Sequence, residues 1–213
     1  MATDNIEYQE IIKQLQVSRE TINSLKIYEN FLLENNRKFN LISKSDEKII
    51  KIRHILDSAQ VIDLINKNDK ICADLGTGAG LPGVVLSILI KERKYKTRVD
   101  LYEKSPRKCH FLSAVVRKLN LNANVLQENI VNQKNLYANT IVVRAFKPIQ
   151  SIFKIVTKNF QYFQNLIVFL GKNGKQTFLD ASKVWDFEYK QRMSITNSDS
   201  LIINIKNIKK KIE

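Results

Sequence analysis

The sequence predicts an α/β protein in which a mostly parallel sheet, covered by helices on both faces, follows a helical N-terminal extension. Two observations predict this class. From residue 70 onward, segments of strand type and helix type alternate along the chain, which is typical of a doubly covered parallel sheet. Before residue 70, apolar residues recur at helical spacing and no proline interrupts them.

The N-terminal stretch predicts two helices. The first spans residues 6–37 and the second spans residues 46–65, with Ser45 or Asp46 as its N-cap. The expected inward-facing residues of the second helix are Ile49, Ile52, Leu56, Ala59 and Ile62. Because no turn rich in glycine or proline follows, we expect residues 1–68 to form an extension packed directly on the remaining unit, residues 69–213.

The alternating part predicts five strands, four helices and a hairpin. The expected strands span residues 70–75, 97–102, 123–126, 140–143 and 166–170. The expected helices span residues 81–91, 106–119, 149–160 and 175–184. Two further β segments, residues 187–195 and 200–205, predict a hairpin that adds one antiparallel strand to the sheet. Residues 206–213 are rich in lysine and are expected to be a solvated tail.

The composition favours a globular protein with a polyanionic partner. The 213 residues are 44% hydrophobic, and their formal net charge is +14. Such an excess is typical of proteins that bind RNA, although a general enrichment in lysine, asparagine and isoleucine would raise the charge as well.

Three features of the sequence indicate the cellular compartment. No segment approaches eighteen uninterrupted apolar residues. The first ten residues lack the basic and then apolar order of a signal peptide. Cys72 and Cys109 fall inside predicted elements without metal-ligand spacing. We therefore expect buried thiols, no metal site and a cytoplasmic protein.

The strongest local signal is a glycine-rich turn after the first predicted strand. Four of the six glycines lie within eight residues, at positions 76, 78, 80 and 83. Glycine permits a positive φ and the close approach of a ligand, and a strand that turns through glycines into a helix suits a nucleotide-like ligand. Glu103, which ends the second predicted strand, is placed to accept hydrogen bonds from both hydroxyls of a ribose, as in enzymes that bind NAD or S-adenosylmethionine.

Asp74 distinguishes between NAD and S-adenosylmethionine as the expected ligand. An acid so close to the turn would repel the pyrophosphate of NAD, whereas S-adenosylmethionine has no phosphate and carries an ammonium and a sulfonium. The residues therefore favour S-adenosylmethionine. An NAD-dependent oxidoreductase remains an alternative because Gly78-x-Gly80-x-x-Gly83 matches the dinucleotide pattern. A non-catalytic RNA-binding protein with a vestigial glycine loop is a second alternative.

The stretch from Asp74 to Gly83 resembles motif I of class I methyltransferases. More narrowly, the chain is similar to the bacterial 16S rRNA guanine-N7 methyltransferase family, known as RsmG or GidB. The similar segments occur in the order typical of that family and are Asn40-Leu41-Ile42, Arg53-His54-Ile55-Leu56-Asp57-Ser58, Gly80-Leu81-Pro82-Gly83, Glu103-Lys104-Ser105 with Lys108 and Phe111-Leu112, and Val143-Arg144-Ala145-Phe146.

This resemblance implies a Rossmann-like class I methyltransferase sheet, S-adenosylmethionine as cofactor, and methylation of N7 of a guanine in 16S rRNA. The implied substrate is the small ribosomal subunit or an assembly intermediate, and the implied enzyme is a monomer that does not bind membranes. The implied cofactor-binding residues are Asp74, Gly76, Gly78, Gly80, Leu81, Glu103, Ile130, Val131 and Arg144. The chain departs from the family pattern at Val143, Lys147-Pro148 and Ile130-Val131, the last of which stands where an acid is common.

Arg144 ends the fourth predicted strand and is the expected catalytic residue. Its guanidinium can bind the carboxylate of the cofactor or O6 of a guanine in bidentate fashion, and an ion pair with a surface acid is the alternative. Methylation at N7 needs no general base, because N7 carries a lone pair and no proton, so proximity and alignment are sufficient. The chain accordingly lacks both an Asn/Asp-Pro-Pro-Tyr motif and a cysteine placed after a strand.

The N-terminal extension also carries candidates for contacts to RNA phosphates. Each of them is individually more typical of solvated surface. They are Lys13, Lys26, Arg37, Lys38, Lys44, Lys48 and Lys51.

Overall fold

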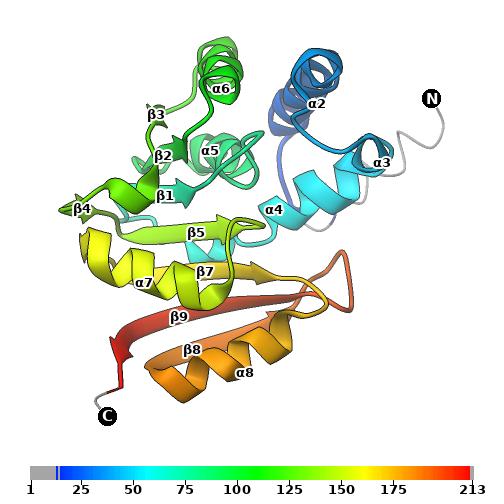
Figure 1. The fold of residues 1–213 in the computed structure, drawn as a ribbon. Helices are drawn as coiled ribbons and strands as arrows, with labels where there is room; N and C mark the ends of the chain where they lie inside the picture. Colours follow the sequence, from blue (N-terminus) through cyan, green and yellow to red (C-terminus); the bar gives the residue numbers. More distant parts are fainter. Residues whose placement is uncertain (1–12, 14, 212–213) are drawn as a thin grey trace.

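In the computed structural model, which describes residue 13 and residues 15–211, the chain forms one twisted sheet of seven strands with helices on both faces (Figure 1). The strand order is β3-β2-β1-β5-β7-β9-β8. The strands are β1 (Ile71–Leu75), β2 (Arg98–Glu103), β3 (Ala123–Gln127), β5 (Thr140–Arg144), β7 (Asn165–Leu170), β8 (Trp185–Met193) and β9 (Leu201–Lys210). Neighbouring strands are parallel from β3 to β7, and β9 is antiparallel to both β7 and β8. This arrangement confirms the predicted fold class.

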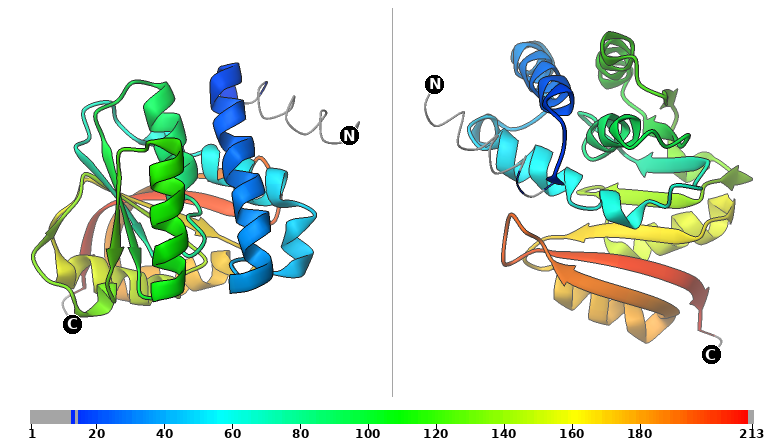
Figure 2. Two further views of the ribbon diagram at one scale, coloured as in Figure 1. Left: turned by 90° about the horizontal axis from the view of Figure 1, so that it is seen from above. Right: turned by 180° about the vertical axis from the view of Figure 1, so that it is seen from behind.

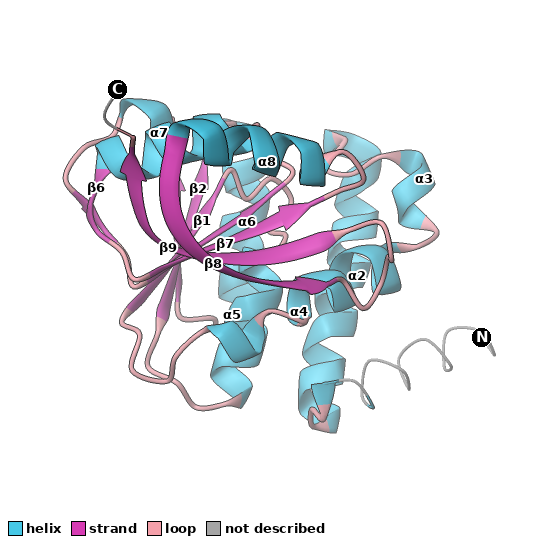
Figure 3. Cartoon of the chain, turned by 90° about the horizontal axis from the view of Figure 1, so that it is seen from below, coloured by secondary structure: helices cyan, strands magenta, loops and turns pink. Residues whose placement is uncertain are grey.

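Alternating side chains place two hydrophobic cores on opposite faces of the sheet. Val142 in β5 and Ile167 in β7 belong to one core, whereas their neighbours Val143 and Val168 belong to the other. The helices of the first face are α2 (Arg19–Phe39), α5 (Gly83–Glu92) and α6 (Pro106–Leu119), and α2 lies beside α6 (Figure 2). The helices of the second face are α7 (Ile149–Asn159) and α8 (Gly174–Val184), which lie together on it (Figure 3).

Helix α2 begins where its N-cap is satisfied. The Ser18 hydroxyl accepts a hydrogen bond from the Thr21 amide, and the same hydroxyl donates to Glu92 at the end of α5. The helix ends at Asn40, which adopts the left-handed conformation with a φ of 49°. The prediction of one helix over residues 6–37 is wrong, because residues 16–18 are not helical and Gln16 has a φ of 50°. The predicted start at residue 6 lies outside the described residues.

The prediction of one helix over residues 46–65 is wrong. The segment is divided into α3 (Lys44–Glu47), the π-helix η1 (Ile50–Leu56), α4 (Asp57–Ala59) and the 3-10 helix η2 (Ile62–Leu64). Ser43 is the N-cap in place of Ser45 or Asp46, because its hydroxyl accepts from the Asp46 amide. Ile49 is exposed, whereas Leu56, Ala59 and Ile62 are buried as predicted. Long-range polar contacts of η1 and α4, described below, hold this irregular shape.

Two departures occur later in the chain. Residues 206–210 of the expected tail instead continue β9, because β8 pairs along this stretch and Ile208 is buried in the second core. Lys206, Lys209 and Lys210 are exposed as expected, and residues 212–213 lie outside the described residues. A small second sheet, formed by β4 (Leu136–Tyr137) and β6 (Phe160–Tyr162), was not expected from the sequence. The 3-10 helix η3 (Ile130–Asn132) lies between β3 and β4.

The N-terminal helices share the first core with the sheet. Leu25, Tyr28 and Leu32 of α2 are fully buried and belong to the same hydrophobic cluster as Val84 of α5 and Leu112 of α6. No boundary in the packing therefore coincides with residue 68, and the division into residues 1–68 and 69–213 stays a prediction.

Two other sequence features are seen in the structure. Cys72 and Cys109 are buried free thiols, and burial is the main reason why the pKa of each thiol is raised. In the part of the chain that the structure describes, no helix combines the length and apolar character that crossing a bilayer requires.

Candidate functional site

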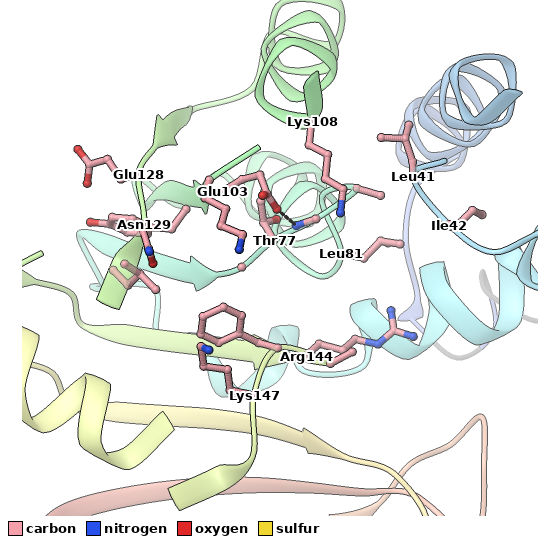
Figure 4. A pocket seen from close by; sticks show the side chains of 18 of the residues that line it. Leu41, Ile42, Thr77, Leu81, Glu103, Lys108, Glu128, Asn129, Arg144 and Lys147 are labelled. Carbon is pink, nitrogen blue, oxygen red and sulfur yellow. Dashed lines mark hydrogen bonds between the residues drawn. The ribbon is translucent and has the colours of Figure 1, made fainter. Parts of the chain in front are cut away.

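A cavity of about 560 Å³ opens at the carboxyl ends of the parallel strands. It lies where the chain order reverses, with β2 on one side of β1 and β5 on the other, which is where open α/β sheets bind ligands. Its wall combines the glycine loop after β1, the end of β2, the start of η3, the loop after β5, and residues from the N-terminal extension (Figure 4).

The glycine loop is held by backbone hydrogen bonds to the neighbouring strand. The amides of Gly76 and Thr77 both donate to the Tyr102 carbonyl, at 2.9 and 3.0 Å. Gly76 and Gly78 have φ values of 71° and 60°, a region that favours glycine. A Cβ on Gly78 would meet only the Gly76 carbonyl oxygen at 3.9 Å, so its surroundings are open toward the cavity.

A tyrosine from the N-terminal helix also holds the loop. Tyr28 of α2 is fully buried, and its hydroxyl donates a 2.9 Å hydrogen bond to the carbonyl of Ala79. Burial is the main reason why the pKa of Tyr28 is well above its ordinary value. Sequence reasoning missed this residue, since a tyrosine on the apolar face of a helix looks like ordinary core.

Glu103 connects the glycine loop to the start of α6. Its Oε2 accepts from the Gly78 amide at 3.1 Å, and its Oε1 accepts from the Ser105 amide at 2.8 Å. The carboxylate lines the cavity and is directed at the loop (Figure 4). Each carboxylate oxygen keeps a lone pair beyond these contacts, so the group can also accept hydrogen bonds from a bound diol.

Asp74 lies beneath the loop. It is 1% exposed and its Oδ2 accepts from the Gly83 amide at the start of α5, at 2.8 Å. Burial raises the pKa of Asp74 to about 6, although the Thr77 hydroxyl and the Gly83 amide act in the opposite direction. The carboxylate therefore joins β1 to α5 and does not line the cavity. Its predicted contact with a cofactor ammonium stays a prediction.

Arg144 crosses from β5 to the N-terminal extension (Figure 4). Its Nε lies 3.2 Å from Asp57 Oδ2, and its Nη2 donates to the Arg53 carbonyl at 2.7 Å. Nη2 also lies 3.0 Å from His54 Nδ1, and the guanidinium lies 6.0 Å from the ring centroid of Phe169. Burial is the main reason why the pKa of Arg144 is lowered. Arg53 and His54 belong to the π-helix η1 and Asp57 begins α4 directly after it, and π-bulges are frequent at functional sites.

The contact with Arg144 determines the tautomer of His54. A guanidinium has only donors, so His54 Nδ1 must accept and its Nε2 carries the proton, which faces Asp46 Oδ2 at 3.6 Å. Burial, followed by the positive charge of Arg144, lowers the pKa of His54 to about 4. The ring is therefore neutral at neutral pH.

The cavity brings most of the predicted site residues together. Those that line it are Gly76, Gly78, Leu81, Glu103, Ile130, Val131 and Arg144. Asp74 and Gly80 do not line it, and a Cβ on Gly80 would overlap Val84 of α5. Lining residues that sequence reasoning did not assign to the site include Asn129, Phe146 and Lys147. Asn129 and Lys147 could have been found only from their positions after the ends of β3 and β5, whereas Phe146 also belongs to the family-like segment that contains Arg144.

The candidate phosphate contacts of the N-terminal extension are not all alike. Lys44 and Lys48 are exposed beside α3, as expected for solvent-facing cations. Lys51 instead lies 3.9 Å from Glu29 and is mostly covered. Additional lysines stand at the cavity itself, namely Lys104, Lys108 and Lys147.

The fold is similar to that of solved methyltransferases. The structure is similar to that of M. capricolum TrmK, solved with S-adenosyl-homocysteine, with a TM-score of 0.53, 20% identity, and coverage of 70% of this chain and 66% of that one. It is also similar to the 16S rRNA methylase RmtB, with a TM-score of 0.56, 13% identity, and coverage of 89% of this chain and 75% of that one.

The sequence defines the family more narrowly. Residues 21–204 match the family described as rRNA small subunit methyltransferase G. The chain is 45% identical over 203 residues to the ribosomal RNA small subunit methyltransferase G of Pelagibacter ubique, covering 94% of this chain and 95% of that protein. The chain therefore belongs to the rRNA small subunit methyltransferase G family, GidB, and the predicted family is confirmed.

Proposed function

We propose that this protein transfers a methyl group from S-adenosylmethionine to N7 of a guanine in 16S rRNA. The observation that carries the proposal is a glycine loop buttressed by Glu103 at the switch point of the sheet, in a chain of this family. The substrate class follows from the family, and the site supplies a cavity suited to the cofactor.

The residues of the cavity fit S-adenosylmethionine. Glu103 can accept from the ribose hydroxyls, while the half-exposed Val131 and the buried Ile130 offer apolar surface to an adenine. The open space around Gly78 admits a ligand close to the backbone. Glu103 would serve the ribose of NAD equally well, so it is the family of the chain that favours S-adenosylmethionine.

Catalysis of this reaction requires alignment of the two reactants and no proton transfer by the protein. The lone pair of guanine N7 forms the new bond to the methyl carbon, and the carbon–sulfur bond breaks with its electron pair going to sulfur. No proton leaves N7, so the neutral His54 and the buried Asp74 need not act as bases. The cofactor supplies the activated methyl group, and the chain holds the two reactants in line and limits their motion.

We propose Arg144 as the residue that connects the acceptor side of the cavity to the N-terminal extension. Arg144→Lys keeps the positive charge but cannot span Asp57, the Arg53 carbonyl and His54 at once. We expect kcat to fall at least tenfold while the affinity for S-adenosylmethionine changes less than threefold. Steady-state kinetics and calorimetry measure the two quantities. An equal loss in both would show that Arg144 serves the cofactor alone.

The test of the function is methyl transfer. Small ribosomal subunits from a strain that lacks the enzyme are incubated with the protein and radiolabelled S-adenosylmethionine, and the modified base is mapped. We expect one N7-methylguanine in 16S rRNA. Absence of incorporation at every assembly stage would refute the proposed substrate.

Calorimetry separates the alternatives. Tight binding of NAD in the absence of binding to S-adenosylmethionine would favour an oxidoreductase. Salt-sensitive binding to RNA without binding of either cofactor would favour a non-catalytic RNA-binding protein.

We further infer that the protein acts as a monomer in the cytoplasm on the small subunit or an assembly intermediate. Its charge of +14 supports a polyanionic substrate, and the two buried free thiols are compatible with a reducing compartment. Sedimentation analysis of the protein alone and with small subunits tests both the oligomeric state and the partner.

A further inference from the structure

The loop after β5 contains an unusual backbone conformation. Ala145 has a φ of 49°, in the left-handed region. This conformation disfavours a residue with a Cβ other than asparagine or aspartate, and such residues cluster at active sites when the surrounding structure holds them in place. Ala145 stands between Arg144 and Phe146 and lines the main cavity.

The left-handed residue directs its two neighbours to different parts of the molecule. Arg144 extends to Asp57 and the N-terminal extension. Phe146 lies against the glycine loop, so close that a Cβ built on Gly76 would stand 2.2 Å from its ring. The turn at Ala145 thus brings an aromatic ring to the backbone that the proposed cofactor approaches.

Phe146 lies where two cavities meet, because it belongs to the lining of both. One is the main cavity, and the other is a cavity of about 330 Å³ at the ends of β5 and β7. Ala145, Phe146 and Lys147 line both of them. The Lys147 ammonium lies 5.6 Å from the centroid of the Phe146 ring, and this cation can neutralise a phosphate near the ring.

A base buried in an RNA structure must leave its stack before a cofactor can reach it, and aromatic side chains then replace the lost stacking. Three aromatic rings line the main cavity, those of His54, Tyr102 and Phe146. His54 is engaged with Arg144 and Asp46. Tyr102 is only 5% exposed, whereas Phe146 is partly exposed. Phe146 is thus the aromatic ring that the main cavity offers to an incoming base.

We propose that the acceptor purine stacks on Phe146, where the linings of the two cavities meet, with Lys147 contacting the phosphate of the same or an adjacent nucleotide. This inference rests on the proposed function, because it names the subsite of the base that receives the methyl group. It assigns a binding role to a ring that would otherwise only support Gly76.

The first experiment compares Phe146→Leu, which keeps apolar bulk but removes the aromatic face, with Phe146→Tyr, which keeps the face. Phe31→Leu is the control, because Phe31 packs on Phe111 between α2 and α6, away from the cavity. We expect kcat/KM for unmethylated small subunits to fall about 5- to 100-fold in Phe146→Leu, with the affinity for S-adenosylmethionine within threefold of wild type. We expect Phe146→Tyr to retain more activity than Phe146→Leu, because it keeps the aromatic face, and Phe31→Leu to stay within threefold of wild type.

Wild-type kcat/KM in Phe146→Leu would overturn the inference. So would a loss of cofactor affinity in Phe146→Leu that accounts for the whole loss of kcat/KM, since that result would mean that the ring only supports the glycine loop.

A second measurement does not depend on methyl transfer. Phe146→Trp adds an indole at the subsite, whereas the native Trp185 is buried in the second core. We expect a short oligoribonucleotide with one guanine, added with S-adenosyl-homocysteine, to quench the added fluorescence, and an oligomer abasic at that position to leave it unchanged. Equal signals from both oligomers would overturn the inference. Quenching by guanine in a protein that methylates no subunit would uphold the subsite and refute only the proposed function.

Discussion

Gly76 and Gly78 both have a positive φ, but glycine is needed at the two positions for different reasons. A Cβ on Gly76 would overlap the ring of Phe146, so this glycine is required by a neighbour within the protein. A Cβ on Gly78 meets nothing closer than 3.9 Å and would extend into open space. At the scale of single residues, a side chain introduced at Gly78 would therefore occupy the space of a ligand. It would not disturb the packing of the protein.

Gly78→Asp is expected to abolish binding of S-adenosylmethionine and to leave the fold largely intact. The aspartate tolerates a left-handed φ, but its carboxylate would stand beside Glu103, whose Oε2 accepts from the amide of this same residue. Calorimetry measures the affinity and circular dichroism follows the melting. Gly78→Ala is the matched control, with a smaller loss of affinity. If Gly78→Asp bound the cofactor normally, the loop would not be the binding site.

Asp74 makes stability depend on pH. Burial raises its pKa from an ordinary value of 3.8 to about 6, so between these values the folded state binds more protons than the unfolded state. Its contribution to stability is fully present below about pH 4 and is lost as the pH rises through about 6. We expect Asp74→Asn to gain stability relative to wild type over that range, by about 3 kcal/mol at most.

Urea denaturation of both proteins at pH 4 and pH 7 measures this difference. The asparagine carbonyl can still accept from the Gly83 amide, which makes the substitution a fair comparison. A difference in free energy of unfolding that does not change with pH would contradict the raised pKa.

At the scale of elements, helix α2 supports the glycine loop from outside the sheet. The Tyr28 hydroxyl bonds the Ala79 carbonyl inside a fully buried environment. The irregular segment η1–α4 supports the other side of the cavity, where Asp57 accepts from Ser194 and Thr196 of the β8–β9 turn and pairs with Arg144. Both supports come from distant parts of the chain.

Tyr28→Phe should lower the free energy of unfolding by about 1–2 kcal/mol, because the Ala79 carbonyl loses its buried donor. We also expect weaker binding of the cofactor, since the loop loses a constraint. Tyr189→Phe is the control, as Tyr189 is 51% exposed on β8. Chemical denaturation and calorimetry check both effects. Equal stabilities of the two variants would show that the Tyr28 hydroxyl does not hold the loop.

At the scale of the whole molecule, the first core joins the N-terminal helices to the sheet. A fragment of residues 69–213 would expose the faces of α5 and α6 that Leu25, Tyr28 and Leu32 cover. We expect the full chain to unfold in one transition and the fragment to lack cooperative unfolding. Far- and near-ultraviolet circular dichroism in urea provide the measurement. A fragment that unfolds cooperatively would establish the predicted boundary as a true domain boundary.

Local signals predicted most of the elements. The helix predicted over residues 106–119 has the same bounds in the structure, because a proline in its first turn starts it and Asn120 in the left-handed conformation ends it. The prediction of one helix over residues 46–65 was wrong. The shape of this segment depends on contacts with residues such as Arg144, which is nearly a hundred residues away in the chain. The prediction of a solvated tail was wrong for a similar reason, because Ile208 is buried only once β8 pairs with β9.

The sequence by itself determined the alternation of strands and helices, the glycine loop, the acid that ends β2, and the family. These features are local patterns, and a pattern of spacing is readable without knowing what packs against it. The tertiary structure decided that Tyr28 holds the loop, that Asp74 is buried beneath it, that Arg144 reaches Asp57, and that Phe146 faces Gly76. Each of these contacts joins residues far apart in the chain, and their distances and burial arise only when the sheet brings the strand ends together.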